Sequence, residues 1–390
     1  MGRGDAVGGL SSVSVKGRET MPYRKPYRKP ISQPTVRVSG DTIRFGSGPS
    51  GVEIQFQRTL RIPDDGRSYA LPPGFGPFPV RRVDDYLDRV PEEWRERGGV
   101  FVPMYQREAM WLLFRGQYWK PRAVKIAVGK VCAITGERWS ESLHQKGRGF
   151  RSTPQDYIVT PPQPWLDGIC TGKGMIRQFV AMPLGMGYTV EGQVTGEERF
   201  GGIQIKVFEP RAGRFPDAPP PPPMARARAS SAMGGSGSPS LCAAAPMGAP
   251  GSAPRARGQK AGSMGLAAGG RMKQKIYRDP HGLKTWDQDN TSRVFVHIVN
   301  SELFREITGD APPPSPVTAR EYAASGLPWF DLYDENASAV KATKILKGVK
   351  SIKELDEDNS SLPLQDDDPV STGPIVSYTL DDTAIRDGNW

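Results

Sequence analysis

The sequence predicts a mainly β protein of the α+β class, with an antiparallel β-sandwich or barrel-like core and a few short helices. Three observations predict it. Short apolar runs rich in Val, Ile and Phe recur with Gly and Pro turns between them, which is the pattern of antiparallel strands. Strands that alternate with long helices, as in a doubly wound parallel sheet, do not occur. The 390 residues include 45 Gly and 38 Pro, an excess that indicates a long disordered insertion and disordered tails beside the folded part.

Residues 1–35 are expected to form a disordered basic tail. They contain the clearest internal repeat of the chain, PYRKPYRK at 22–29, and each Pro-Tyr-Arg-Lys unit favours an extended backbone. One interpretation is a solubilising arm, because charge runs are usually solvated. The other is an arm that binds nucleic acid, with its cations on phosphates and its tyrosines on bases. The residues concerned are Tyr23, Arg24, Lys25, Tyr27, Arg28 and Lys29.

Residues 36–215 are expected to form a β-rich domain. Its strand patterns are, in order, TVRVSG, TIRFGSG, GVEIQFQRTLRIPDDG, VFVPMYQ, AMWLLFRGQYW, AVKIAVGKVCAITG, DYIVTPP, IRQFVAMPLG, YTVEGQVTG and GIQIKVFEP. The segment VDDYLDRVPEEWRERGG has helical spacing instead, with Pro91 at a tolerated first position and Gly98 at the end.

Residues 216–263 are expected to be a disordered linker or loop, because five consecutive prolines and a stretch rich in Gly, Ala and Ser cannot build a packed core. Residues 264–350 have α+β patterning but few strands. The apolar run RVFVHIV at 293–299 is therefore expected to complete the first domain, the alternative being a separate domain. Residues 351–390 carry two basic and ten acidic residues and are expected to be an acidic tail.

Two helices are expected after the run RVFVHIV. The first is NSELFREITG, with Asn300 as the N-cap and Gly309 at the end. The second begins at Thr318, which has Glu321 three residues later in capping-box spacing.

The net charge of +10 is concentrated in the segments expected to be disordered. Residues 1–30 carry +5, residues 211–275 carry +9 and residues 351–390 carry −8. This distribution does not indicate a basic face on the folded part. Nucleic acid is therefore a possible partner through the tail alone, and a protein partner or a second copy of the chain is the expected one.

A soluble, cytoplasmic protein without a membrane span is expected. The three cysteines are odd in number and widely spaced, which disfavours a disulfide framework. The N-terminal residues lack the apolar core of a signal peptide, and no run approaches the ~20 apolar residues of a membrane span.

The stretch GICTGKG at 168–174 has the glycines and lysine of a phosphate-binding loop without its spacing. Only three residues separate Gly168 from the Gly172–Lys173 pair, and Gly174 stands where Ser or Thr would hold magnesium. We interpret the stretch as a turn before a strand.

No cofactor and no metal are expected. His144, His281 and His297 lack partners at ligand spacing, and no C-x-x-C motif occurs. His297 lies in an apolar strand pattern, where a hydrogen-bonded core histidine is the commoner case.

Catalysis would need residues that only the fold can bring together. Cys132 and His144 are one such pair, as nucleophile and base. The paired acids of the sequence are expected to be solvated, because neighbours on a strand or helix point apart. These pairs are Asp64–Asp65, Asp84–Asp85 and Glu92–Glu93.

Four aromatic residues are candidates for a ligand-binding face: Trp111, Tyr118, Trp119 and Trp165. A sandwich face lined with aromatic rings can bind sugars or peptides. The alternative, favoured by the area that such rings bury, is that they belong to the core.

The stretch FPVRRVDDYLDRVPEEWRERGGVFVPMYQREAMWLLF, together with PQPWLDGI, resembles a bacterial and fungal protein family with no assigned activity. The resemblance implies no catalytic residue and no cofactor. The leading interpretation is a non-enzymatic, β-rich binding or structural protein that acts through protein–protein contacts. The alternatives are a nucleic-acid-binding or shell protein that uses its basic N-terminal arm, and a hydrolase whose site is assembled only in the fold.

Overall fold

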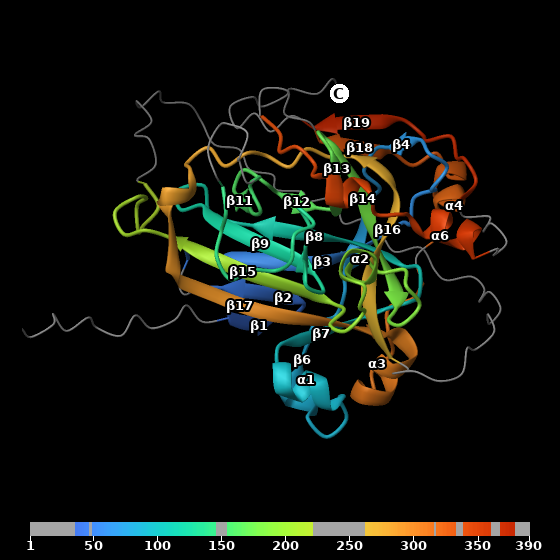
Figure 1. The fold of residues 1–390 in the computed structure, drawn as a ribbon, viewed down its shortest axis with the longest axis horizontal. Coiled ribbons are helices and arrows are strands. Elements are labelled where there is room, and N and C mark those ends of the chain that lie inside the picture. Colours follow the sequence, from blue (N-terminus) through green and yellow to red (C-terminus); the bar gives the residue numbers. More distant parts are fainter. Residues whose placement is uncertain are drawn as a thin grey trace, which may run out of the picture. The chain divides into compact units, whose positions relative to one another are not determined.

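A computed structural model describes residues 36–46, 49–145, 154–220, 262–315, 317–332, 338–359 and 367–378. The expected basic tail and most of the expected linker lie outside these residues. Within them the fold class predicted from the sequence is confirmed. A 17-stranded, mostly antiparallel sheet is accompanied by a few short helices (Figure 1).

The long strands of the sheet form two runs. The first run is, in hydrogen-bonding order, β1 (Val36–Ser39), β2 (Thr42–Phe45), β3 (Val52–Thr59), β8 (Ala109–Arg115), β14 (Met175–Pro183) and β16 (Ser263–Lys273). The second run is β17 (Trp286–Asn300), β15 (Ile203–Pro210) and β9 (Arg122–Val128). Only the pairs Ser263–Val299 and Met264–Ile298 join β16 to β17, so the two runs meet at a corner. Through these pairings β16 and β17 belong to the same sheet as the strands before the linker.

One hydrophobic core contains alternate residues of both runs, which therefore face each other. They include Ile43, Phe45, Ile54, Phe56, Leu112, Phe114, Val124, Ile126, Ile203, Ile205, Val294 and Val296. Full burial of each such side chain stabilises the fold by about 1.5–3 kcal/mol. Every residue of β9 and β15 is buried, because a further cluster around Tyr157, Phe208 and Trp286 covers part of their other face. This double burial explains why β9 has a nearly continuous apolar run, interrupted by Lys125.

Shorter strands extend the sheet. They are β4 (Ser68–Tyr69), β5 (Gly74–Pro77), β6 (Arg81–Arg82), β7 (Val100–Met104), β10 (Val131–Cys132), β11 (Ile158–Thr160), β12 (Trp165–Leu166) and β13 (Gly168–Gly172). Strand β7 pairs in parallel with the end of β17. A separate two-stranded parallel sheet consists of β18 (Trp329–Leu332) and β19 (Ile375–Tyr378).

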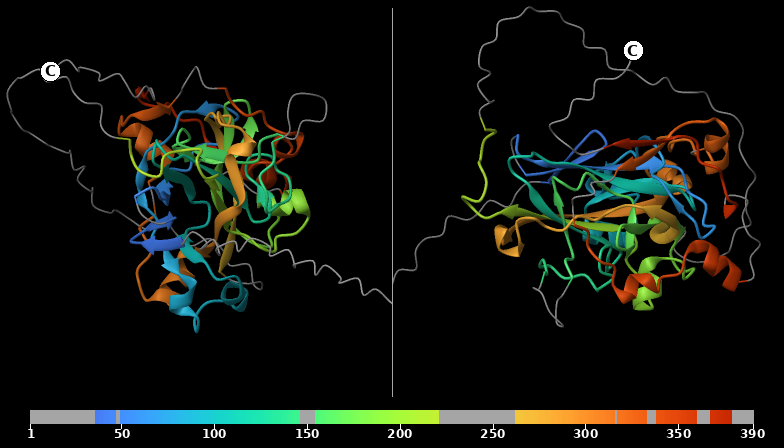
Figure 2. Two further views of the ribbon diagram at one scale, coloured as in Figure 1. Left: turned by 90° about the vertical axis from the view of Figure 1, so that its left-hand side faces the viewer. Right: turned by 90° about the horizontal axis from the view of Figure 1, so that it is seen from above.

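The helices are short. They are α1 (Glu92–Arg97), α2 (Val190–Thr195), α3 (Ser301–Thr308), α4 (Ala319–Ala324), α5 (Lys344–Lys347) and α6 (Ile352–Asp358), with 3₁₀ turns at Val83–Tyr86 and Leu283–Thr285. A small core of its own packs α1 and α3 against β7 and β17, and both helices lie on the same side of the sheet (Figures 1 and 2). Its residues are Val83, Val90, Trp94, Phe101, Val299, Phe304 and Ile307.

The caps predicted for α3 and α4 are present. Asn300 accepts a hydrogen bond from the backbone N–H of Glu302, and Gly309 ends α3 at φ +81°. Thr318 and Glu321 form the expected capping box. The prediction of a strand in YTVEGQVTG is wrong, because Thr189 caps α2 and the left-handed Gly196 ends it. These local signals outweigh the alternating pattern of the segment.

The stretch GICTGKG forms most of a β-hairpin. Its first five residues are β13 itself, Gly174 turns the chain at φ +75°, and β14 follows. A Cβ at Gly168 would lie 1.8 Å from the carbonyl oxygen of Arg177. The glycines thus serve strand pairing at close approach.

Residues 351–378, expected to be part of an acidic tail, contain α6 and β19. A capping box at Ser351 and Glu354 starts α6, and Ile352 and Asp356 are buried. The apolar periodicity of this helix is weak because two of its contacts with the sheet are ionic, namely those of Glu354 with Arg177 and of Asp356 with Arg107.

Candidate anion-binding groove

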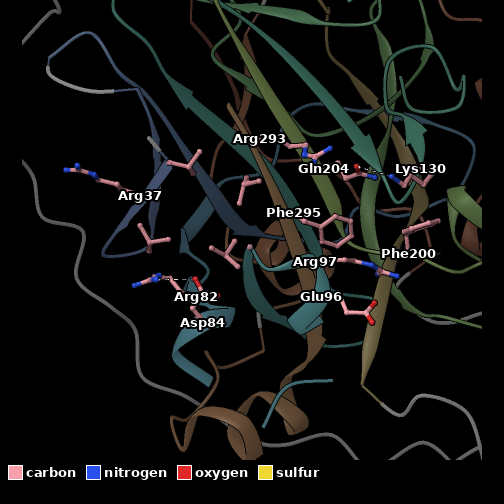
Figure 3. A pocket seen from close by; sticks show the side chains of 15 residues that line it. Arg37, Arg82, Asp84, Glu96, Arg97, Lys130, Phe200, Gln204, Arg293 and Phe295 are labelled. Carbon is pink, nitrogen blue, oxygen red and sulfur yellow. Dashed lines mark hydrogen bonds and ion pairs between the residues drawn. The ribbon is translucent and has the colours of Figure 1, made fainter. Parts of the chain in front are cut away.

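A cavity of about 810 Å³ opens where β1, α1 and the start of β7 approach β15 and β17. We call it the basic groove. Its polar and aromatic lining residues are Arg37, Arg82, Asp84, Glu96, Arg97, Lys130, Phe200, Gln204, Arg293 and Phe295 (Figure 3).

The groove has more basic than acidic side chains, and several of the basic ones are not neutralised. Arg82 pairs with Asp84 at 3.3 Å. Within the described ranges, Arg37, Arg97 and Lys130 form no ion pair. The expectation that the folded part has no basic face is therefore wrong. The cations come from different segments, so a count of charge along the sequence did not reveal them.

Aromatic rings hold the central cations. The Arg97 guanidinium lies 4.8 Å from the centre of the Phe200 ring and 5.7 Å from that of Phe295. Lys130 Nζ lies 4.8 Å from the same Phe200 ring, and Arg199 lies 5.6 Å from it. In Figure 3, Arg97 extends between the two phenyl rings. Such contacts stabilise a cation by about 0.5–1 kcal/mol at exposed sites, and they leave its N–H groups available to an anion.

The charged state of these cations is disfavoured in the absence of an anion. Burial lowers the pKa of Arg97. Burial also lowers the pKa of Lys130, and the like charges of Arg293 and Arg97 lower it further, although Glu141 opposes this shift. A bound anion would relieve both effects, because an opposite charge nearby favours the ionised form.

The loop after α2 positions Phe200. The buried carboxylate of Glu191 accepts hydrogen bonds from the backbone N–H groups of Phe200 at 3.1 Å and Gly201 at 2.7 Å. Gly202 follows at φ +56°, and a Cβ there would lie 2.3 Å from the carbonyl oxygen of Val296 on β17. The sequence FGG therefore brings the phenyl ring to the groove by passing tightly over the sheet.

His297 of β17 packs against α1, the helix that carries Arg97. This histidine is buried, as expected from its apolar strand, and its ring stacks on Trp94 of α1 at 4.5 Å. Its Nε2 lies 3.0 Å from the Gly98 carbonyl oxygen, so Nε2 carries the proton. Burial lowers the pKa of His297 to about 3, which keeps the ring neutral. At the next residue, a Cβ on Gly99 would lie 2.2 Å from the carbonyl oxygen of Phe295.

The sequence-predicted binding residues lie elsewhere. Tyr23, Arg24, Lys25, Tyr27, Arg28 and Lys29 are outside the described residues. The four aromatic candidates form two pairs, Trp111–Trp165 with ring centres 5.9 Å apart and Tyr118–Trp119 at 5.2 Å. Tyr118 is 67% exposed, and Trp165 packs partly buried against the core. None of the four lines the basic groove.

The fold brings Cys132 and His144 to the same residue without forming a nucleophile–base pair. Cys132 Sγ lies 3.4 Å from the backbone oxygen of Asp156, whereas His144 Nδ1 lies 2.9 Å from its carboxylate. Burial raises the pKa of the Cys132 thiol, so it stays protonated. Lys125 also contacts the Asp156 carboxylate, at 2.7 Å.

The acid pair at 64–65 is not solvated, contrary to expectation. Asp64 is buried near Arg177, and burial raises its pKa. Asp65 accepts a hydrogen bond from the hydroxyl of Tyr69 at 2.7 Å. The turn that carries both acids folds back on the sheet, so they support structure. Asp84, Asp85 and Glu92 are exposed as expected.

Among the described residues, no group of three or more His, Cys, Asp or Glu side chains is placed to hold a metal ion. No helix in that part of the chain has the length and apolar character needed to cross a membrane. Comparison of the chain with protein-family models, curated proteins and solved structures gave no match.

Sequence reasoning missed Arg97, Lys130, Phe200, Arg293 and Phe295. One signal was present. Single cations occur inside AVKIAV and IQIKVF and at the start of RVFVHIV, and of these three only Arg293 lines the groove. A charged residue inside a buried strand is rare unless it is paired, so each marks a position with a special partner.

Proposed function

We propose that the protein binds single-stranded nucleic acid without catalysis, through the basic groove. The observation that supports this most is that Arg37, Arg97 and Lys130 line the groove without an ion pair among the described residues, and that Arg97 and Lys130 contact the Phe200 ring. Positively charged grooves with aromatic side chains are the usual means of holding a single strand, because cations contact phosphates and rings stack on bases.

The N-terminal repeat supports the same proposal. Its arginines and lysines would contact phosphates and its tyrosines would stack on bases. A cytoplasmic location is part of this proposal.

The proposal is tested with the full chain and a labelled single-stranded oligonucleotide, followed by fluorescence anisotropy at low salt. We expect binding that weakens as salt rises, since counterions are released from the phosphates. Arg97→Gln should weaken it, whereas Arg115→Gln, which removes an exposed arginine of β8 outside the groove, should not. Absence of binding by the parent chain at low salt would contradict the proposal.

A second candidate function, self-assembly or binding of a protein partner, is favoured by the small sheet of β18 and β19. Leu327, Ile375 and Val376 next to or in this sheet are 46%, 54% and 37% exposed. Exposed apolar side chains that cluster often mark protein contacts. Light scattering of the parent and of Ile375→Ser tests it. A concentration-dependent mass that falls in the variant supports assembly, and a monomer in both contradicts it.

A further inference from the structure

Three cations form a row across the second run of strands. Lys206 of β15 is paired directly with Lys125 of β9 on one side and with Arg293 of β17 on the other. Gln204 and Phe295, which line the basic groove, lie two residues from Lys206 and Arg293 on the same strands. Side chains two residues apart on a strand share a face, so this cation row continues the groove along the sheet.

Like charges directly opposite each other destabilise a sheet, and two acids relieve this row. Asp156 binds Lys125 at 2.7 Å, with both side chains almost fully buried. Glu141 binds Lys206 at 2.9 Å and Arg293 at 2.9 Å, and its side chain is 53% exposed. Asp156 is thus locked in the interior, whereas Glu141 reaches the row from the solvent side.

The surroundings of the Glu141 carboxylate are those of a bound anion. Besides the two cations, the indole N–H of Trp139 donates a hydrogen bond to it at 2.9 Å. Burial alone would raise the pKa of Glu141, but the hydrogen bonds of Trp139 and Lys206, with the charges of Lys206 and Arg293, lower it to about 2. A cavity of about 330 Å³ lies beside it, lined by Glu141, Lys206, Thr291, Ser292 and Arg293.

We propose that Trp139, Lys206 and Arg293 form a phosphate subsite that Glu141 occupies until a phosphate of the bound strand displaces it. The subsite rests on the proposed function for its ligand, and Arg293 connects it to the groove because it lines both cavities. Glu141 then competes with the bound strand for Lys206 and Arg293. This competition weakens binding and reduces the number of phosphates that the protein can neutralise. The three donors remain in place when the carboxylate swings out, since only its own side chain has to move.

The first test is the binding of a single-stranded oligonucleotide by Glu141→Gln in the full chain. Two ion pairs are lost, one exposed and one with the nearly buried Lys206. At the strength of surface pairs, affinity at 0.1 M salt should rise by about 2- to 30-fold. The plot of log K against log salt should steepen by about 0.7, which corresponds to one further phosphate contact. Glu137→Gln is the matched control, because it removes an exposed acid of the same loop that does not contact the row. Equal affinity and slope in the two variants would overturn the subsite.

A second measurement separates the subsite from the proposed function. The ¹H–¹⁵N signal of the Trp139 indole is followed while inorganic phosphate is added. It should shift at lower phosphate concentration in Glu141→Gln than in the parent chain. A shift without any nucleic-acid binding would keep the subsite and remove the proposed function. No shift in either protein, with circular dichroism showing both folded, would overturn the subsite itself.

Discussion

Arginine side chains have different neighbours in the basic groove and beneath the C-terminal segment. Under α6 and the residues around 367, arginines that flank strands of the sheet pair with acids of the C-terminal segment. Arg61 pairs with Asp367 at 2.5 Å and Arg107 with Asp356 at 2.8 Å. We call this region the arginine clamp. In the groove, Arg97 has two phenyl rings for neighbours and no ion pair among the described residues.

The two sets of cations differ in their burial and in their counter-charges. In the clamp, Arg61 and Asp367 are both nearly buried, so neither is accessible to a ligand. In the groove, rings and the loop after α2 hold the cations without cancelling their charge. The clamp therefore attaches a segment of the chain to the sheet, whereas the groove leaves its positive charge available to an external anion.

The largest effect is expected in the clamp. Asp367→Asn removes the carboxylate that pairs with the buried Arg61, and breaking such a pair costs about 3–5 kcal/mol. Urea denaturation of the variant should show this loss, with oligonucleotide binding unchanged once the protein is folded. A loss below about 1 kcal/mol would mean that the pair behaves as a surface pair.

The next effect concerns pH. Glu108 lies 3.8 Å from Arg58, yet burial raises its pKa to about 7. A raised pKa in the folded state gives stability that is complete below the unfolded pKa near 4.5 and is lost as pH rises through about 7. That loss is on the order of 3 kcal/mol for a shift of this size. Glu108→Gln should remove it, so the unfolding free energy should fall less between pH 5 and pH 8 than in the parent. The same fall in both proteins would contradict the assignment.

A smaller effect is expected in the groove. Phe200→Ala removes the ring that contacts Arg97 and Lys130 and a surface on which a base can stack. Stacking on one aromatic side chain is worth about 1–3 kcal/mol, so the dissociation constant should rise by about 5- to 150-fold. Anisotropy measures it, and Phe75→Ala, at an exposed ring outside the groove, is the control. Equal affinities for the two variants would remove Phe200 from the site.

The smallest effect sharpens the comparison within one segment. Asp368 follows the buried Asp367 and pairs with Arg320. Both side chains of this pair are more than half exposed. Asp368→Asn should change the unfolding free energy by less than about 1 kcal/mol. Equal losses of unfolding free energy in Asp367→Asn and Asp368→Asn would contradict the view that burial distinguishes the clamp.

The parts of the fold that depend on neighbours in sequence could be predicted. Asn300 and Gly309 bound α3 because caps act within a few residues, and the alternating strands follow from a side-chain period of two. Helix α2 was missed because its six residues are too few to show a helical period. The C-terminal acids looked like a tail because their partners are far away, as with Asp356 and Arg107, 249 residues apart.

The groove could not be predicted for the same reason. Arg37, Arg97 and Lys130 come from three different segments, and no segment alone has a sequence pattern that indicates a binding site. The pairing of β15 with β9 and β17, together with the close pass of Gly99 beside Phe295, brings their segments to one surface. What the sequence could reveal was a set of single cations in apolar strands, without the surface that they share.

The central claim is that the groove contacts phosphates directly, and the salt dependence of binding tests it. The measurement compares the parent chain with the Arg97→Gln/Lys130→Gln double variant, using the same single-stranded oligonucleotide over a range of salt concentrations. The account predicts that the slope of log K against log salt becomes shallower by about 1.4 in the double variant, because two phosphate contacts are lost. An unchanged slope, with the variant folded, would contradict it.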